Sequence, residues 1–227
     1  MSASEAERSK RLQRTAGIAR GSAWRGAGLA LFLVVLPGPL AGEPARTLAG
    51  RAVLYEEDAF SSGKTFPGSV VWRVMPYKPP VGQPDDVAIH ADIEIPERQL
   101  KLTLVMHRNF DAAVPASHLI ELNFTLPPDF PGFGIDKVPG MLMKSNETAR
   151  GTPFAGLSVK TADTSFRVGL AGTGESRAKN MALFRDNAWM DIPIMYSTQA
   201  RAILAIEKAA SGSTIFEDAL AAWGRNP

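Results

Sequence analysis

Strict alternation of apolar and polar residues on either side of one short turn is the feature that most restricts the fold of this chain. A period of two gives a strand one buried face and one solvated face. Pairing Ile95 with Leu100 across the turn Pro96–Gln99 places every apolar residue on one face and Glu94 opposite Lys101 on the other, whereas a one-residue slip would bury polar groups. The sequence therefore predicts an antiparallel hairpin in this register, closed by a four-residue loop. The apolar positions are Ile89, Ala91, Ile93, Ile95, Leu100, Leu102, Leu104 and Met106.

Short apolar runs separated by turn residues continue along the chain and predict further strands. Two segments have helical character, Ser176–Asn187 and Ile215–Trp223, and the second is preceded by a capping box of Thr214 and Glu217. About ten short strands and two short helices predict a mainly β domain, either an antiparallel β-sandwich or an open barrel. The other expected strands are Arg51–Glu57, Ser69–Tyr77, His118–Leu126, Met141–Lys144, Phe154–Lys160, Ser165–Leu170, Ile192–Tyr196 and Ala202–Lys208, with polar turns at Phe60–Gly68 and a long irregular loop at Pro127–Pro139.

The N-terminal part of the chain combines a basic stretch with an apolar one. Six basic and two acidic residues lie in the first 42 positions, and the apolar block Gly26–Leu36 (GAGLALFLVVL) is followed at once by Pro37. The uncharged run up to Gly42 has 17 residues, fewer than the ~20 that a spanning helix needs, and it has the layout of a secretory leader. The sequence predicts a signal peptide or short membrane anchor over 1–42, a linker over 43–50 and an exported β-rich domain over 51–227. We expect the domain in the periplasm, either free or held at the inner membrane.

Composition excludes several classes of function. The chain has 25 basic and 23 acidic residues, of which the first 42 positions hold six and two, so residues 43–227 have 19 and 21 and a net charge of −2. The basic character belongs to the leader, and we expect no nucleic-acid partner. The chain has no cysteine, which removes disulfides, thiol nucleophiles and cysteine-ligated metals.

Several stretches of this sequence look like known families. The segments RAVLYEE (Arg51–Glu57), ADIEIPER (Ala91–Arg98), DIPIMY (Asp191–Tyr196) and RAILAIEK (Arg201–Lys208), together with Pro115–Pro139, resemble an uncharacterised family of N-terminally anchored or exported alphaproteobacterial proteins. The order of elements in Met141–Trp223 is similar to the C-terminal half of the invasion-associated locus B family, whose members are small exported β-rich proteins. The cysteines often seen in that family are absent here. These resemblances imply an exported β-domain and bring no known activity.

One candidate binding cluster follows the best-defined strand. Arg108, Asn109 and Asp111 end this strand, and the planar guanidinium of Arg108 suits a carboxylate ligand. The alternative is that these residues fix the following loop through local hydrogen bonds.

A second candidate lies in the long loop before Pro139. Phe130 and Phe133 stand there among prolines and glycines, and loops of this length are often functional. Exposed aromatic rings at these positions would contact a partner or a lipid surface. Alternatively, the rings fold back and cap the core.

No catalytic constellation is evident in the sequence. Glu56, Glu57 and Asp58 cluster at the end of an expected strand, where solvation accounts for them, and no motif for a cofactor or a metal stands out. The sequence therefore favours a non-enzymatic envelope domain that binds an unknown envelope protein or a small ligand. Two alternatives remain: a sensor or regulatory module tethered to the inner membrane by an uncleaved leader, and an envelope hydrolase whose active site is built from scattered residues.

Overall fold

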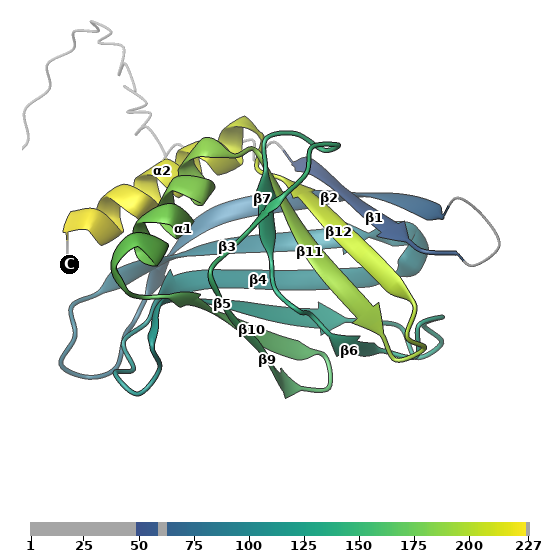
Figure 1. Cartoon of the computed structure of the whole chain (residues 1–227), viewed down its shortest axis with the longest axis horizontal. Helices are drawn as coiled ribbons and strands as arrows, with labels where there is room; N and C mark the ends of the chain where they lie inside the picture. Colours follow the sequence, from purple (N-terminus) through teal and green to yellow (C-terminus); the bar gives the residue numbers. More distant parts are fainter. Residues whose placement is uncertain (1–48, 59–62, 226–227) are drawn as a thin grey trace, which may run out of the picture. The chain divides into compact units, whose positions relative to one another are not determined.

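The computed structural model describes residues 49–58 and 63–225, so the predicted leader and most of the predicted linker lie outside the described residues. Twelve strands and two helices follow one another along this part of the chain (Figure 1). The elements are β1 Gly50–Glu56, β2 Lys64–Tyr77, β3 Asp86–Ile95, β4 Leu100–Arg108, β5 Ala116–Thr125, β6 Ile135–Lys137, β7 Leu142–Lys144, β8 Thr152–Pro153, β9 Gly156–Ala162, β10 Ser165–Ala171, α1 Gly174–Asp186, β11 Trp189–Tyr196, β12 Arg201–Glu207 and α2 Ala209–Arg225.

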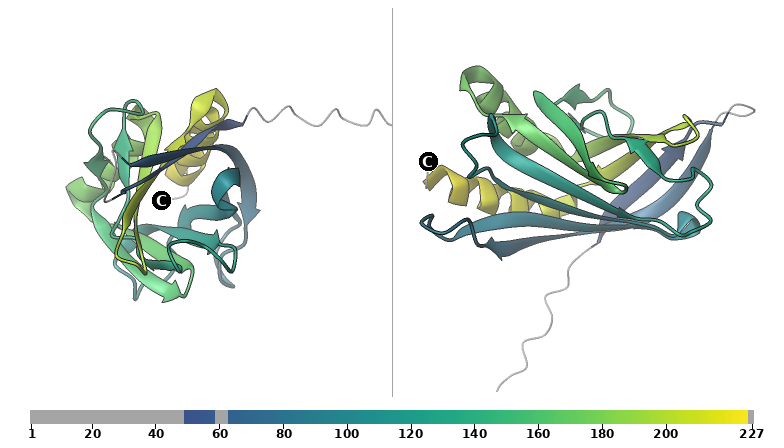
Figure 2. Two further views of the ribbon diagram at one scale, coloured as in Figure 1. Left: turned by 90° about the vertical axis from the view of Figure 1, so that its right-hand side faces the viewer. Right: turned by 90° about the horizontal axis from the view of Figure 1, so that it is seen from below.

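All the strands belong to one antiparallel sheet. Its order is β8-β7-β11-β12-β1-β2-β3-β4-β5-β10-β9, and β6 pairs with β11 beside this path. Seen along the strands, the sheet curls around a common interior (Figure 2). The predicted mainly β class is confirmed, and of the two predicted architectures the domain adopts the open barrel.

The central hairpin has the predicted register. Ile95 pairs with Leu100 and Ala91 with Leu104, and the Glu94 carboxylate lies 2.8 Å from Lys101 Nζ on the outer face. The connection is a single 3-10 turn at Pro96–Arg98, after which Gln99 adopts φ 46°. This hairpin fixes the inward and outward positions of the neighbouring strands.

Inward-facing side chains fill the curl. Aromatic residues from both helices and from β2 meet in the interior: Trp72 and Phe216 pack edge to face with ring centroids 5.1 Å apart, and Phe184 stacks on Phe216 at 5.5 Å. These three side chains are at most 1% exposed. Tight packing of this kind leaves no room for a ligand next to these rings.

Helix α2 lies on the inside of the curled sheet and closes one of its ends together with α1 (Figures 1 and 2). Its side chains Phe216 and Trp223 are buried, but the predicted start of this helix at Ile215 is wrong. The helix begins at Ala209, and Thr214 is an interior residue whose hydroxyl donates to the carbonyl of Ala210 instead of capping the N-terminus. In the segment before Thr214, Gly212 lies directly against the indole of Trp72 and leaves no room for a side chain.

Alanine at position 212 is expected to lower the free energy of unfolding by about 1–3 kcal/mol, because a Cβ atom would overpack the core. A Cβ built on Gly212 lies 2.9 Å from Cδ1 of Trp72, which is itself buried. Gly224, near the end of the same helix, has open space around it, so Gly224→Ala should leave stability unchanged or raise it by a few tenths of a kcal/mol. Urea denaturation of both variants checks this expectation, and equal stabilities would contradict it.

A buried lysine ties the end of α1 to the start of α2. Lys208 is 2% exposed, and its ammonium donates to the carbonyls of Phe184 and Asn187 at the C-terminus of α1. A cation is favourable at this end of a helix. Burial lowers the pKa of Lys208 to about 8.

Two segments predicted as turn or loop contain strands. β2 begins at Lys64 within the predicted turn Phe60–Gly68, because its first residues pair with β1 from Lys64 opposite Glu56 to Val70 opposite Gly50. The short strand β6 lies in the predicted loop Pro127–Pro139 and pairs with β11. Among the residues described, neither helix has the length and apolar character needed to cross a membrane.

Candidate functional site

The outer side of β1, β12 and β11 is unusually apolar for a solvated sheet face. These strands lie side by side in the sheet (Figure 1). Their inward residues belong to the core. The middle of each strand turns apolar residues outward (Val53 and Tyr55 on β1, Ile203 and Ala205 on β12, Pro193 and Met195 on β11), and the charged residues of the same face, among them Arg51, Asp191, Arg201 and Glu207, lie around them. Antiparallel sheets with one solvated face normally carry polar residues there. The apolar residues on this face therefore indicate contact with something other than water.

Part of this face is covered by the segment that follows β7. Glu147 in this segment accepts a hydrogen bond from Tyr55 Oη at 2.6 Å and lies 2.9 Å from Nη1 of Arg51. Beneath the segment, Val53 is 4% exposed and Ala205 is fully buried. The hydrogen bond from Tyr55 lowers the pKa of Glu147, and burial together with Glu147 raises the pKa of Tyr55 to about 12.

A buried ion pair anchors the same segment. Lys144 Nζ lies 2.7 Å from Oδ1 of Asp191, and the two side chains are 5% and 12% exposed. Burial raises the pKa of Asp191, while Lys144 opposes this rise. Removing one partner of such a pair would leave an uncompensated buried charge, so the pair disfavours separation of the end of β7 from β11.

The uncovered remainder of this face forms an open groove of about 930 Å³. We define the outer groove by five apolar or aromatic side chains: Tyr55, Pro139, Pro193, Met195 and Ile203. Ile203 is 41% exposed. Charged residues border one end, namely Glu57, Asp58 and Arg201.

Two of the acidic residues that line the groove, Asp58 and Glu56, form ion pairs with basic side chains. Asp58 lies 3.4 Å from Lys64 Nζ. Glu56, at the end of β1, is paired with Arg98 and accepts a hydrogen bond from Tyr196 Oη at 2.8 Å. Glu57 and Asp58 are chain neighbours at one end of the groove and do not face each other from opposite walls, as the two carboxylates of a glycosidase do. Within the described ranges, no three His, Asp or Glu side chains converge on a point that a metal ion could occupy.

The structure places Arg108, Asn109 and Asp111 around a pocket of about 550 Å³ at the end of the barrel that α1 and α2 close. Arg108 Nε donates to Asp86 Oδ2 at 2.7 Å, and both side chains are largely buried. Asn109 Nδ2 donates to the carbonyls of Asp111, Val114 and Ala116, and Asp111 Oδ1 accepts the amide of Ala113. These contacts match the alternative in which the cluster fixes its own loop, although Arg177 of α1 also lines the pocket.

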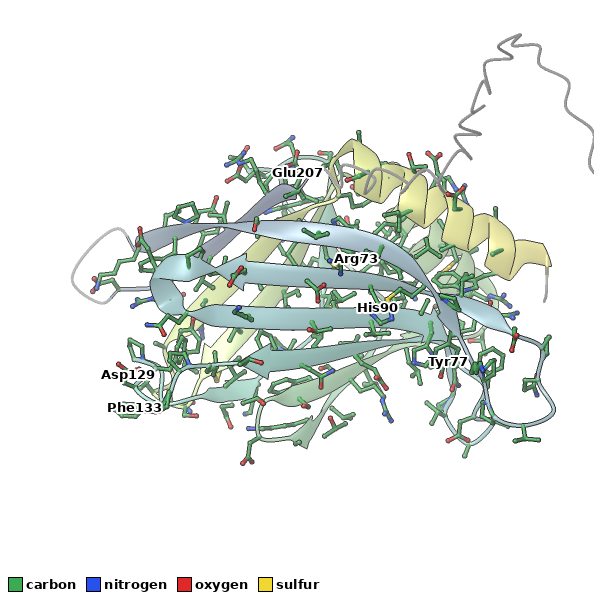
Figure 3. All side chains as sticks on the ribbon, turned by 180° about the vertical axis from the view of Figure 1, so that it is seen from behind. Arg73, Tyr77, His90, Asp129, Phe133 and Glu207 are labelled. Carbon is green, nitrogen blue, oxygen red and sulfur yellow. The ribbon has the colours of Figure 1, made fainter. Side chains whose placement is uncertain are left out.

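The two phenylalanines of the long loop have different environments. Phe130 is 3% exposed and packs edge to face on Tyr196 with ring centroids 5.2 Å apart, so the expectation that the loop exposes this ring is wrong. Phe133 is 83% exposed, at the end of the strands opposite to Tyr77 (Figure 3). Tyr77 stacks near Phe110, which lines the pocket of Arg108. The structure therefore does not bring Phe133 together with Arg108, Asn109 and Asp111.

Comparison with known proteins finds no relative: no protein-family model matches the chain, and neither do any curated proteins or solved structures. The family resemblances of the sequence therefore stay predictions.

Sequence reasoning missed the outer groove, although a signal for it was present. In the runs Arg201–Glu207 (RAILAIE) and Trp189–Tyr196 (WMDIPIMY), apolar residues occupy inward and outward positions alike and do not alternate with polar ones. In an antiparallel sheet, strands without alternation are apolar on both faces. Such a run indicates that something other than water contacts the outer face.

Proposed function

We propose that this chain is an exported, non-enzymatic binding domain of the cell envelope that holds an apolar segment of a protein partner in the outer groove. The observation that carries the proposal is the row of outward-facing apolar side chains, Tyr55, Pro193, Met195 and Ile203, on strands whose inward face is already buried in the core. Ile203 is exposed and the other three side chains are half-buried. Apolar surface that stays accessible on a sheet face marks an interaction site.

The shape of the groove favours a protein segment over a small molecule. Pockets for small ligands are concave and bury most of the ligand surface, whereas the outer groove lies on a sheet face and is open to solvent. Its rim offers Glu57 and Arg201, which form no ion pair with another described residue. A segment with apolar residues and a flanking charge would complement both the floor and the rim.

The other two candidate functions have less support. A hydrolase would need two groups positioned on either side of a bound substrate, and the acidic residues of the groove stand together at one end. A membrane-tethered sensor depends on the leader, which lies outside the described residues. Neither alternative accounts for an apolar outer face.

Selection of random twelve-residue peptides displayed on phage against the domain of residues 43–227 tests the proposal. We expect enriched peptides with two or more apolar residues, because the groove floor is apolar. Replacing Ile203 with lysine should weaken binding of a synthetic selected peptide at least tenfold in fluorescence anisotropy, since a buried charge without a partner costs well above 1.4 kcal/mol.

The matched control is Asn123→Lys, on the exposed outer side of β5 and away from the groove. This variant should bind the peptide as the unchanged domain does. Failure to enrich any peptide, or equal loss of affinity in both variants, would rule out the groove as a binding site.

A further inference from the structure

The curled sheet does not close, and a cleft of about 210 Å³ marks the seam between its two ends. On one side lie β8, the first residue of β7 (Leu142) and Met141 before it; on the other side lies β9. We call this cleft the seam cleft and define its β9 wall by Gly156, Leu157 and Ser158.

The seam cleft and the outer groove adjoin each other. Pro139 and Pro193 line both hollows, so the two hollows meet at these prolines. An apolar surface thus runs from Ile203 of β12, across the two prolines, to Leu157 of β9.

β9 is an edge strand with exposed apolar side chains. It pairs with β10 on one side and ends the sheet order on the other, so no described strand pairs with its outer edge. Leu157 is 78% exposed and Val159 is 54% exposed. Sheets usually protect such edges with charge, proline or shortening, as the opposite edge does with the two-residue β8 that ends in Pro153.

Two polar groups of β9 limit where an additional strand fits. Lys160 Nζ donates to the carbonyl of Ile135 in β6 at 2.8 Å and so bridges the seam at one end. Ser158 Oγ, which borders the cleft, is buried and has no hydrogen-bond partner among the described residues. The accessible edge is therefore Gly156–Val159, where the main chain and the outward side chains of Leu157 and Val159 are open to an added strand while the Ser158 hydroxyl stays buried.

We infer that the partner segment binds in an extended conformation as an added strand on the Gly156–Val159 edge of β9, and that it continues past Pro139 and Pro193 into the outer groove. This inference rests on the proposed function and specifies the backbone conformation in which the partner segment binds. Main-chain hydrogen bonds to an open sheet edge provide affinity in this mode, and alternate side chains provide specificity. An extended segment of about four residues spans the accessible edge, and it has to be free of proline where its amides face β9.

A scan of backbone N-methylation in the selected peptide tests the inference without altering the protein. In an added strand, only every second amide faces β9. N-methylation should therefore weaken binding about tenfold at alternate positions and much less at the positions between. Amide hydrogen exchange of the domain should slow on β9 when the peptide binds, while the amides of the β3–β4 hairpin remain unchanged.

The two outcomes are separable. Loss of binding in Ile203→Lys, combined with an N-methylation profile that lacks alternation and unchanged exchange on β9, would overturn strand addition while the groove remains the binding site. If alternation and β9 protection are present but Ile203→Lys binds normally, the edge is used and the groove proposal fails.

Discussion

Replacing Trp223 with alanine is expected to lower the free energy of unfolding by about 4 kcal/mol and the melting temperature by roughly 8–16 °C. Trp223 is 3% exposed, and its indole Nε1 donates to the carbonyl of Val87 at 3.0 Å. It thereby holds the C-terminal part of α2 against β3, and its removal leaves both a cavity and an unpaired buried carbonyl. Chemical denaturation monitored by circular dichroism measures the change.

Trp223→Phe is the matched control for this prediction. A phenyl ring refills most of the cavity but cannot donate to Val87, so we expect a loss of about 1–2 kcal/mol, close to that of one hydrogen bond plus a small void. A loss below 1 kcal/mol in the alanine variant would show that α2 is not fixed to the sheet through this residue.

The parts of the fold that depend on residues close together in the sequence could be predicted. The hairpin register followed from alternation on both sides of Pro96–Gln99, because each strand selects its own buried face and the loop is too short to permit another pairing. The start of α2 could not be predicted in this way. Ala209–Thr214 has the composition of a loop, and the close approach of its Gly212 to Trp72 joins residues 140 positions apart, which no local pattern reveals.

The candidate site also depends on contacts between residues far apart in the sequence, which local patterns do not predict. Phe130 and Phe133 are three positions apart in one loop, yet one ring is buried on Tyr196 and the other is exposed. No local pattern separates them, because the difference arises from where β11 places Tyr196. The outer groove likewise depends on the pairing of Tyr55 with Ile203, which joins strands near opposite ends of the described domain.

Acidification is expected to destabilise the domain through His118, the inward-facing histidine of β5. Its ring is 2% exposed and packs on Trp223 with ring centroids 4.7 Å apart, while Nε2 has no hydrogen-bond partner among the described residues. Burial, helped by the nearby charges of Arg177 and Arg108 and opposed by Asp86, lowers the pKa of His118 to about 3. The unfolded chain, with a histidine pKa of about 6.5, therefore takes up a proton that the folded chain does not.

Because the unfolded state binds more protons between pH 6.5 and 3, stability falls as the pH falls through this window, by up to ~1.4 kcal/mol per pH unit from this residue. In His118→Gln this contribution is absent, whereas carboxylates and the other histidines titrate in both proteins and cancel in the difference. The quantity to measure is the free energy of unfolding of the unchanged domain minus that of the variant, obtained by urea denaturation at pH 7.5 and at pH 4.5. We expect this difference to be about 2–3 kcal/mol lower at pH 4.5. A difference that does not vary with pH would mean that His118 protonates in the folded domain, which requires water or an acidic group to reach Nε2 beside Trp223.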